Sequence, residues 1–237
     1  MGFFKMLRQL TDRRPRVHFL HIGKTGGTSI KYALLPHCEK LPVRVRTHQH
    51  ETPLRHVPAG EGFFFFLRNP VTRFISGFNS RLRMGRPRLN VPWTPEEEIA
   101  FKRFTTADQL AQALLSPDTA ERAAAERAMR GIGHVNMCYR RWYESEDYFL
   151  SRLTDVILIG FQETLNQDFE ILKTRLRLPA EVQLPSDNVS THRTPAGMNQ
   201  TLQPGSITAI EKWYADDFKF YALCQELVSE KRVGKSL

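Results

Sequence analysis

Cysteine and long apolar runs are both scarce in this chain of 237 residues. Its three cysteines, Cys38, Cys138 and Cys224, are widely spaced. Disulfide-dependent secreted domains are dense in cysteine, so we expect reduced thiols, as in cytoplasmic proteins. No apolar run approaches the roughly eighteen residues of a membrane-spanning helix. Residues 1–15 also lack the apolar core of a signal peptide, and we expect a flexible N-terminus with at most peripheral membrane contact.

Acidic residues are few relative to basic ones. The chain has 25 Asp and Glu against 34 Lys and Arg, which gives a formal net charge of +9. This excess favours anionic ligands such as a nucleotide, an acidic glycan, a lipid headgroup or nucleic acid. Nucleic acid is disfavoured, because the basic residues are scattered and no RNA-recognition or zinc-finger signature is present. The densest basic cluster predicts either a substrate-binding rim or a solvated loop, and consists of Arg81, Arg83, Arg86 and Arg88.

Two common nucleotide-binding signatures are absent, namely GxxxxGK[ST] and GxGxxG. A different glycine loop is present. Residues 17–22 are mostly apolar and predict a buried strand, the turn Gly-Lys-Thr-Gly-Gly follows at 23–27, and Thr28 and Ser29 begin a predicted helix. Backbone N–H groups at a helix start, the helix dipole and the close approach that glycine allows together form an anion-binding loop. We therefore expect a phosphorylated or sulfated group to bind there.

A second motif follows a second predicted strand. Residues 62–67 form a continuous apolar run that ends at Arg68. Pro70 suits the first turn of a helix, and on that helix Arg73 and Ser76 are expected to share a face. Arg68, at the carboxyl end of its strand, is expected to point into the crevice where open α/β sheets bind ligands. The alternative is an arginine paired only with solvent or a carboxylate.

A pair of histidines lies between these motifs. Residues 43–50 alternate in polarity, which predicts a strand with one solvated face, so His48 and His50 are expected to face the same side. Histidine suits the role of a general base near neutral pH. Surface histidines are the alternative, and a metal site is disfavoured because no cysteine pair or third spaced ligand accompanies them. His21 is expected to be a core or loop-bracing residue.

Together these motifs resemble sulfotransferases that use 3′-phosphoadenosine 5′-phosphosulfate (PAPS). The Lys-Thr-Gly-Gly-Thr-Ser loop is similar to that of carbohydrate sulfotransferases, although Gly23 stands where many members have proline. The His-x-His pair is similar to that of heparan sulfate 2-O-sulfotransferases. The resemblance implies that the following residues bind the cofactor: Gly23, Lys24, Thr25, Gly26, Gly27, Thr28 and Ser29 at the 5′-phosphosulfate, Arg68 and Ser76 at the 3′-phosphate, and Arg193 as a further phosphate contact. An ordinary exposed loop is the alternative for Arg193.

The resemblance also implies the catalytic residues Lys24, His48 and His50. His48 would remove the proton of the acceptor hydroxyl, and His50 would help to position the acceptor. Lys24 would neutralise charge on the departing phosphate, so no metal is expected. His134 and Arg140 are weaker candidates for acceptor or nucleotide contacts.

The expected fold is a single α/β domain over residues 1–237, with a mainly parallel sheet flanked by helices. This is the P-loop-kinase-like architecture that the resemblance implies. Helix starts near Thr94, Thr106 and Ser116 predict a helical insertion over residues 90–131, which would serve either as a lid or wall near the acceptor or as scaffolding. A strand at 155–160, a helix at about 163–177 and one final helix at about 207–227 complete the prediction.

The function implied by the resemblance is transfer of a sulfuryl group from PAPS to a hydroxyl, on a carbohydrate or another small molecule, with 3′,5′-ADP as product. Golgi members of the family carry a membrane anchor, and because none is predicted here we expect a cytoplasmic, bacterial protein. Two alternatives remain. One is a P-loop-like nucleotide or small-molecule kinase, which would need a Walker-type lysine and Mg²⁺, and the other is a non-catalytic basic protein that binds glycans or nucleic acid.

Overall fold

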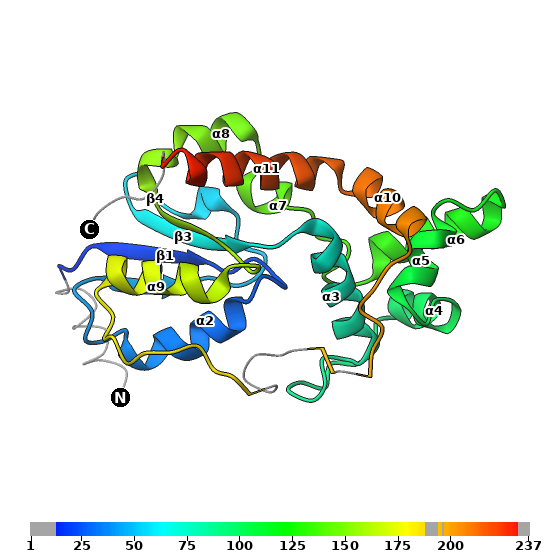
Figure 1. Cartoon of the computed structure of the whole chain (residues 1–237), viewed down its shortest axis with the longest axis horizontal. Coiled ribbons are helices and arrows are strands. Elements are labelled where there is room, and N and C mark those ends of the chain that lie inside the picture. Colours follow the sequence, from blue (N-terminus) through cyan, green and yellow to red (C-terminus); the bar gives the residue numbers. More distant parts are fainter. Residues whose placement is uncertain (1–12, 188–193, 196, 232–237) are drawn as a thin grey trace.

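The structure, a computed structural model, describes residues 13–187, 194–195 and 197–231. In these residues a four-stranded parallel sheet has the order β2-β1-β3-β4. The strands are β1 (Arg16–Leu20), β2 (Arg44–Thr47), β3 (Gly62–Leu67) and β4 (Val156–Phe161). Helices cover both faces of the sheet (Figure 1). The predicted α/β fold with a parallel sheet is confirmed.

Successive side chains of β3 point to opposite faces of the sheet, so one apolar run packs against helices on both faces. Phe63 and Phe65 pack on one face against α11 (Ala215–Ser229), and Phe64 and Phe66 pack on the other against α2 (Gly27–Leu34) and α9 (Leu165–Leu176). The short helices α7 (Arg140–Tyr143) and α8 (Glu146–Ser151) share the face of α11. All six residues of β3 are buried, which is typical of a central parallel strand.

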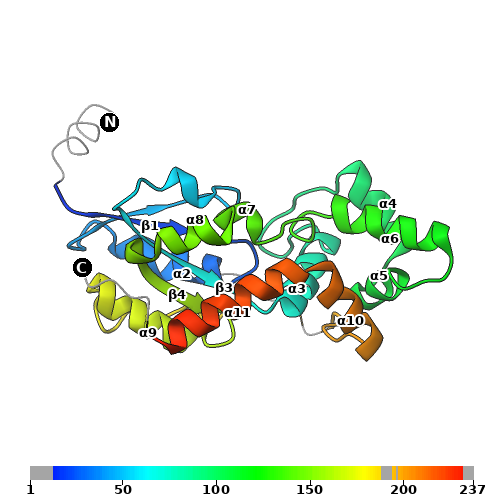
Figure 2. The same ribbon diagram turned by 90° about the horizontal axis from the view of Figure 1, so that it is seen from above.

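The predicted helical insertion forms a separate apolar cluster beyond the end of the sheet. It contains α4 (Pro95–Arg103), α5 (Ala107–Ala113) and α6 (Thr119–Gly131), which pack with α3 (Pro70–Leu82) and α10 (Pro204–Trp213) (Figures 1 and 2). The predicted capping box at Thr94 and the cap at Thr106 are present. The third helix begins later than predicted, because Asp118 rather than Ser116 accepts the N-terminal N–H bond.

Two predicted elements are wrong in extent. The strand around residues 43–50 ends at Thr47, so the two histidines lie beyond it. The single final helix is instead two helices, α10 and α11, that meet at Tyr214. The Tyr214 hydroxyl donates a hydrogen bond of 2.5 Å to the carbonyl of Val135, which ties this break to the core. Short 3₁₀ turns at Leu35–His37, Leu54–His56 and Leu153–Asp155 complete the described elements.

The strand order determines where a ligand site forms. The chain passes from β1 to β2 on one side and then to β3 on the other side of β1. This reversal leaves a crevice at the carboxyl ends of β1 and β3, which is where open α/β sheets bind ligands. Both predicted cofactor motifs follow these two strands. Among the described residues, no helix is both long enough and apolar enough to cross a membrane.

Candidate active site

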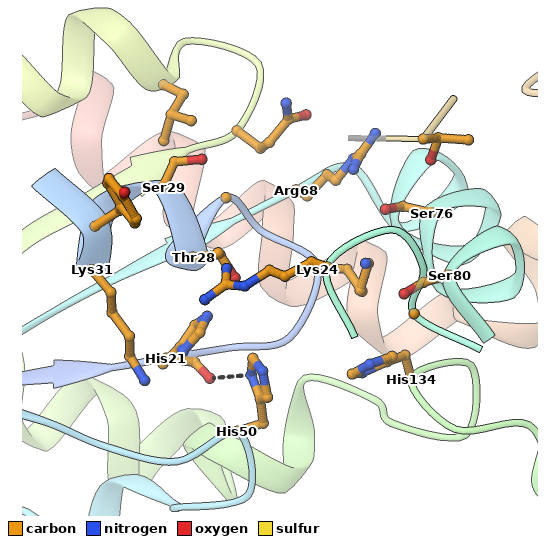
Figure 3. A pocket seen from close by; sticks show the side chains of 18 of the residues that line it. His21, Lys24, Thr28, Ser29, Lys31, His50, Arg68, Ser76, Ser80 and His134 are labelled. Atoms are coloured by element: carbon orange, nitrogen blue, oxygen red, sulfur yellow. Dashed lines mark hydrogen bonds between the residues drawn. The ribbon is translucent and has the colours of Figure 1, made fainter. Parts of the chain in front are cut away.

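A cavity of about 750 Å³ lies at the carboxyl ends of β1 and β3 (Figure 3). The loop after β1, the start of α2, helix α3 and the segment around His134 contribute to its walls. Its charged lining residues within the described ranges are all basic, namely Lys24, Lys31, Arg68, Arg81 and Arg88. A cavity lined by cations without a carboxylate attracts polyanions. Across the ranges that the structure describes, no three His, Cys, Asp or Glu side chains lie so as to hold a metal ion.

The glycine loop leaves the start of α2 open toward this cavity. Gly26 caps the helix at φ 87°, a left-handed conformation that glycine adopts without steric cost, and no side chain caps α2. A Cβ on Gly27 would lie 2.1 Å from Cδ2 of His21, so only glycine fits there. Gly26, Gly27, Thr28 and Ser29 line the cavity. The loop therefore has the backbone geometry of an anion-binding helix start.

Gly23 and Thr25 shape the loop from behind. Neither is among the residues that line the cavity. The buried Thr25 hydroxyl donates to the carbonyl of Ile22 at 2.9 Å. The carbonyl of Gly23 accepts a hydrogen bond of 3.1 Å from Nε of Arg73. Both residues thus hold the turn that carries Lys24.

Lys24 reaches the cavity from a strained backbone. Its φ is 69°, in the left-handed region that non-glycine residues rarely adopt. Burial, and to a lesser extent the charges of Arg83 and Arg68, lowers the pKa of Lys24 to about 7. No hydrogen bond or ion pair joins its amine to another described residue. An unpaired, desolvated amine beside other cations favours a bound anion, which would restore its charged form.

Arg68 lines the cavity as the sequence motif predicts. Its Nε donates to the Thr72 hydroxyl at 3.0 Å, and burial lowers its pKa. The hydroxyl of Tyr139 accepts a hydrogen bond of 3.0 Å from the backbone N–H of Arg68 and donates one of 2.5 Å to the backbone carbonyl of Arg68. These two bonds hold the backbone at the end of β3. Ser76 and Ser80, one turn apart on α3, line the same wall.

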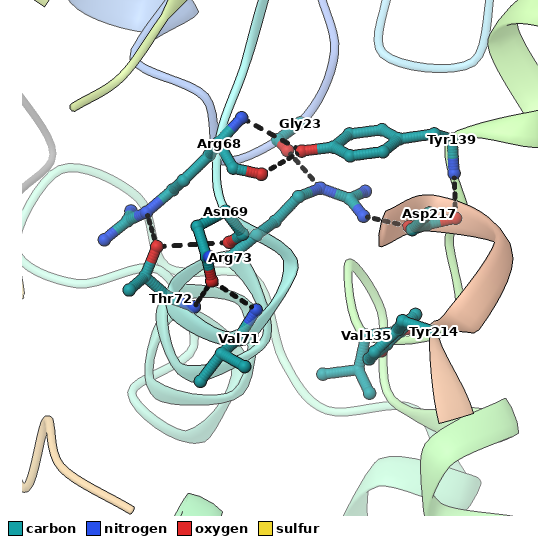
Figure 4. Close-up of polar contacts among 10 residues, drawn as sticks. All are labelled: Gly23, Arg68, Asn69, Val71, Thr72, Arg73, Val135, Tyr139, Tyr214 and Asp217. Atoms are coloured by element: carbon teal, nitrogen blue, oxygen red, sulfur yellow. Dashed lines mark hydrogen bonds and ion pairs between the residues drawn. The ribbon is translucent and has the colours of Figure 1, made fainter. Parts of the chain in front are cut away.

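Arg73, which is expected to share a helix face with Ser76, is buried with 3% exposure and does not line the cavity as Ser76 does. Besides its bond to Gly23, its Nη1 pairs with Asp217 Oδ2 at 3.4 Å, and its guanidinium lies 4.7 Å from the centre of the Tyr139 ring (Figure 4). Asp217 Oδ1 accepts the Tyr139 N–H at 2.8 Å. This network of Arg73, Tyr139 and Asp217, hereafter the brace, connects both cofactor loops. Sequence reasoning missed it, because no local pattern links residues from three distant segments.

His50 lines the cavity with a defined tautomer. A carbonyl oxygen only accepts hydrogen bonds, so the contact of 3.1 Å between His50 Nδ1 and the carbonyl of His21 requires a proton on Nδ1. In the neutral ring the lone pair is then on Nε2. Burial lowers the pKa of His50. The His21 and His134 rings lie beside it, with centroid distances of 4.0 Å and 5.8 Å.

His48 does not face the same side as His50, and that expectation is wrong. Its Nε2 lies 2.8 Å from Nδ1 of His18, whose Nε2 lies 2.6 Å from Oε2 of Glu61. The His48 ring is buried and is not among those lining the cavity. Burial first, and the neighbouring His18 second, lowers its pKa to about 4. Because β2 ends at Thr47, the two-residue period of a strand does not extend to the pair.

The basic cluster begins in the last turn of α3, and its members differ in burial. Arg81 is buried in a two-bond ion pair with Glu97, of 2.6 Å and 2.5 Å, so it belongs to no solvated loop. Arg88 is exposed and lines the cavity. No described residue of α4, α5 or α6 lines it, so these three helices support α3 from outside, and Val91 is the described residue of the predicted insertion that lines the cavity. Arg140 is exposed and bonds to the carbonyl of Glu144 at 3.2 Å, and Arg193 lies outside the described residues.

A model of the sulfotransferase family matches residues 8–223, which include all four strands and both loops. The chain belongs to the sulfotransferase family. No curated protein shows a significant match to it. Membership in a transferase family favours sulfuryl transfer over the kinase and the non-catalytic alternatives. In this sulfotransferase the family match and the cavity coincide, because both include Lys24 and Arg68.

Proposed function

We propose that this protein transfers the sulfuryl group of PAPS to a hydroxyl of a carbohydrate acceptor. One observation carries the proposal. The glycine loop with Lys24 and the motif with Arg68 and Ser76, which are separate in the sequence, line a single cavity whose charged residues within the described ranges are all basic. A donor with a phosphosulfate at one end and a 3′-phosphate at the other needs two such cationic ends.

The residues at each end differ in the anion they suit. Lys24 and the backbone of residues 26–29 would hold the 5′-phosphosulfate, because helix starts bind phosphate and sulfate through N–H groups. Arg68 would hold the 3′-phosphate together with Ser76, because a guanidinium makes paired, charge-assisted hydrogen bonds to phosphate oxygens. Arg193 remains a proposed additional contact. When bound, PAPS supplies an activated sulfuryl group that can pass to an oxygen nucleophile.

His50 is the general base in this proposal, in place of His48. Its Nε2 lone pair accepts the hydroxyl proton as the acceptor oxygen bonds to sulfur and the bond from sulfur to the phosphate oxygen breaks. Lys24 neutralises the charge that develops on that phosphate oxygen. His48 instead supports the segment that carries His50, because its carbonyl accepts a hydrogen bond of 3.2 Å from Lys31.

The proposed acceptor is a carbohydrate with acidic groups. Lys31 and Arg88 line the cavity but belong to neither cofactor motif, so they are available to an anionic acceptor. Tyr32, with 58% of its surface exposed, also lines the cavity and offers an aromatic face to a sugar ring. Lys31 and Tyr32 lie on α2, which begins at the proposed cofactor loop, and Arg88 lies in the loop after α3.

Two measurements test the proposal. Calorimetry should show that 3′,5′-ADP binds without Mg²⁺ and more tightly than ADP, whereas a kinase would prefer ATP with Mg²⁺. Incubation with ³⁵S-labelled PAPS should then label a member of a panel that contains desulfated heparin, desulfated chondroitin and neutral glycans. Tight binding of glycans without binding of 3′,5′-ADP would favour the non-catalytic alternative. Equal affinity for 3′,5′-ADP and ADP would contradict the assignment of Arg68 and Ser76.

A further inference from the structure

His134 has a strained backbone conformation that neighbouring residues hold in place. Its φ is 66°, in the left-handed region that favours glycine. Gly77, inside α3, lets it approach, because a Cβ on Gly77 would lie 3.3 Å from the Cβ of His134. The preceding N–H, of Gly133, donates to Oε1 of Glu97 at 3.0 Å. Strain held in place by its surroundings is typical of functional positions.

No bond within the described part of the chain explains why a histidine is there. Nδ1 of His134 is buried and has no hydrogen-bond partner among the described residues. The side chain lines the cavity, so Nε2 is the ring nitrogen available to a ligand. Buried polar groups in folded proteins are nearly always paired, and an exception needs an explanation. A structural role would use the imidazole's hydrogen bonds, and this one leaves them unused.

The position of the ring points to the donor side of the cavity. A Cβ on Gly23, beside Lys24, would lie 3.3 Å from Nδ1 of His134. Burial lowers the pKa of His134 well below its ordinary value, and among charged groups Lys24 lowers it most. Among charged groups Lys31 has the largest effect on the pKa of His50. Figure 3 shows the two rings side by side below Lys24. His134 is thus a neutral imidazole beside Lys24.

We propose that His134 is a further catalytic residue, whose Nε2–H donates a hydrogen bond to an oxygen of the sulfuryl group during transfer. The proposal rests on the proposed function. It adds a third side chain at the reacting centre, with a role separate from those of Lys24 and His50. A neutral donor contributes without a second positive charge beside Lys24, and the fold places it there before the ligand binds.

Two substitutions distinguish this role from a structural one. His134→Asn keeps a residue that tolerates positive φ, but its amide reaches only as far as Nδ1. His134→Gln places an amide N–H near the position of Nε2. The readouts are single-turnover transfer from ³⁵S-labelled PAPS to desulfated heparin and to water, affinity for 3′,5′-ADP, and the thermal midpoint. His56→Asn, at an exposed position, is the matched control and should match the wild type in all four.

We expect His134→Asn to lower the transfer rate at least about tenfold, as for loss of one preorganised donor, with 3′,5′-ADP affinity and thermal midpoint unchanged. His134→Gln should recover part of the lost rate. A rate for His134→Asn within twofold of the wild type, or a parallel loss of affinity and midpoint, would overturn the proposal, as would a His134→Gln rate no higher than that of His134→Asn. If the wild type binds 3′,5′-ADP but transfers sulfate neither to glycan nor to water, the proposed function itself fails.

Discussion

Binding of 3′,5′-ADP should draw a proton from solution at pH 8, and Lys24 should be its destination. The pKa of the Lys24 amine is lowered from 10.5 to about 7 by burial first and by neighbouring arginines second. At pH 8 about nine-tenths of the free protein then has a neutral Lys24. A phosphate bound beside the amine favours its charged form and raises that pKa again. The expected uptake is on the order of 0.9 proton for each ligand bound.

The sign of this effect gives a pH dependence. Because the bound state holds more protons than the free state above pH 7, affinity for 3′,5′-ADP should fall as pH rises through 8 and 9. The two phosphates of the ligand, each with a second pKa of about 6, are already ionised there and contribute little. The histidines at the site, whose pKa values are lowered, are neutral in both states.

Titration calorimetry in two buffers of different ionisation enthalpy, such as Tris and HEPES, measures the uptake directly. Lys24→Met should abolish it while retaining binding through the backbone of α2. His56→Asn, at an exposed position, should leave it unchanged. Uptake below about 0.2 proton in the wild type would refute the reasoning, because an amine with an ordinary pKa near 10.4 is already charged at pH 8. Equal uptake in Lys24→Met would assign the proton to another group.

Three further predictions concern the rest of the site. Arg68→Ala should weaken 3′,5′-ADP by on the order of 2 kcal/mol, as for a charged hydrogen bond, and 5′-AMP far less; calorimetry that shows equal losses would reject the 3′-phosphate assignment. His50→Ala should lower kcat about 10²-fold or more and remove the acidic limb of the pH–rate profile. In the wild type that limb should lie below pH 6.5, because the pKa of His50 is lowered. A variant that retains the limb would exclude His50 as the base. Asp217→Ala should lower the free energy of unfolding in urea by about 3–5 kcal/mol, because Arg73 would remain buried without the carboxylate that balances its charge; a loss below about 1 kcal/mol would contradict the brace.

A second substitution in the brace distinguishes an effect on loop position from an effect on fold stability. Asp217→Asn keeps an acceptor for the Tyr139 N–H but removes the charge that faces Arg73. If the brace positions the loops, this milder change should raise the KM for PAPS. The reason is that the Gly23 carbonyl and the Arg68 backbone are both bonded to its members.

The sequence by itself determined the elements that local chemistry controls. The apolar run before Arg68 predicts β3 at residues 62–67, as observed. Six consecutive buried side chains suit only a central strand or a core helix. Pro70, at the start of α3, favours the strand, because it marks where the next helix begins. Gly26 and Gly27 predict the open start of α2, since their backbone needs no partner elsewhere in the chain. The resemblance to sulfotransferases rested on these two segments and on the pair of His48 and His50, and the family match supports membership in the family.

Only the tertiary structure decided which side chains face the cavity. His48 and His50 differ in role because β2 ends one residue before the pair, and strand ends depend on pairing with β1 rather than on local pattern. His134 lies beside Lys24 because Gly77, Glu97 and Tyr214 hold its segment from three other elements. The buried ion pair of Arg73 with Asp217 forms between residues far apart in the chain. Such contacts depend on how helices pack, and packing combines distant residues that carry no shared local signal.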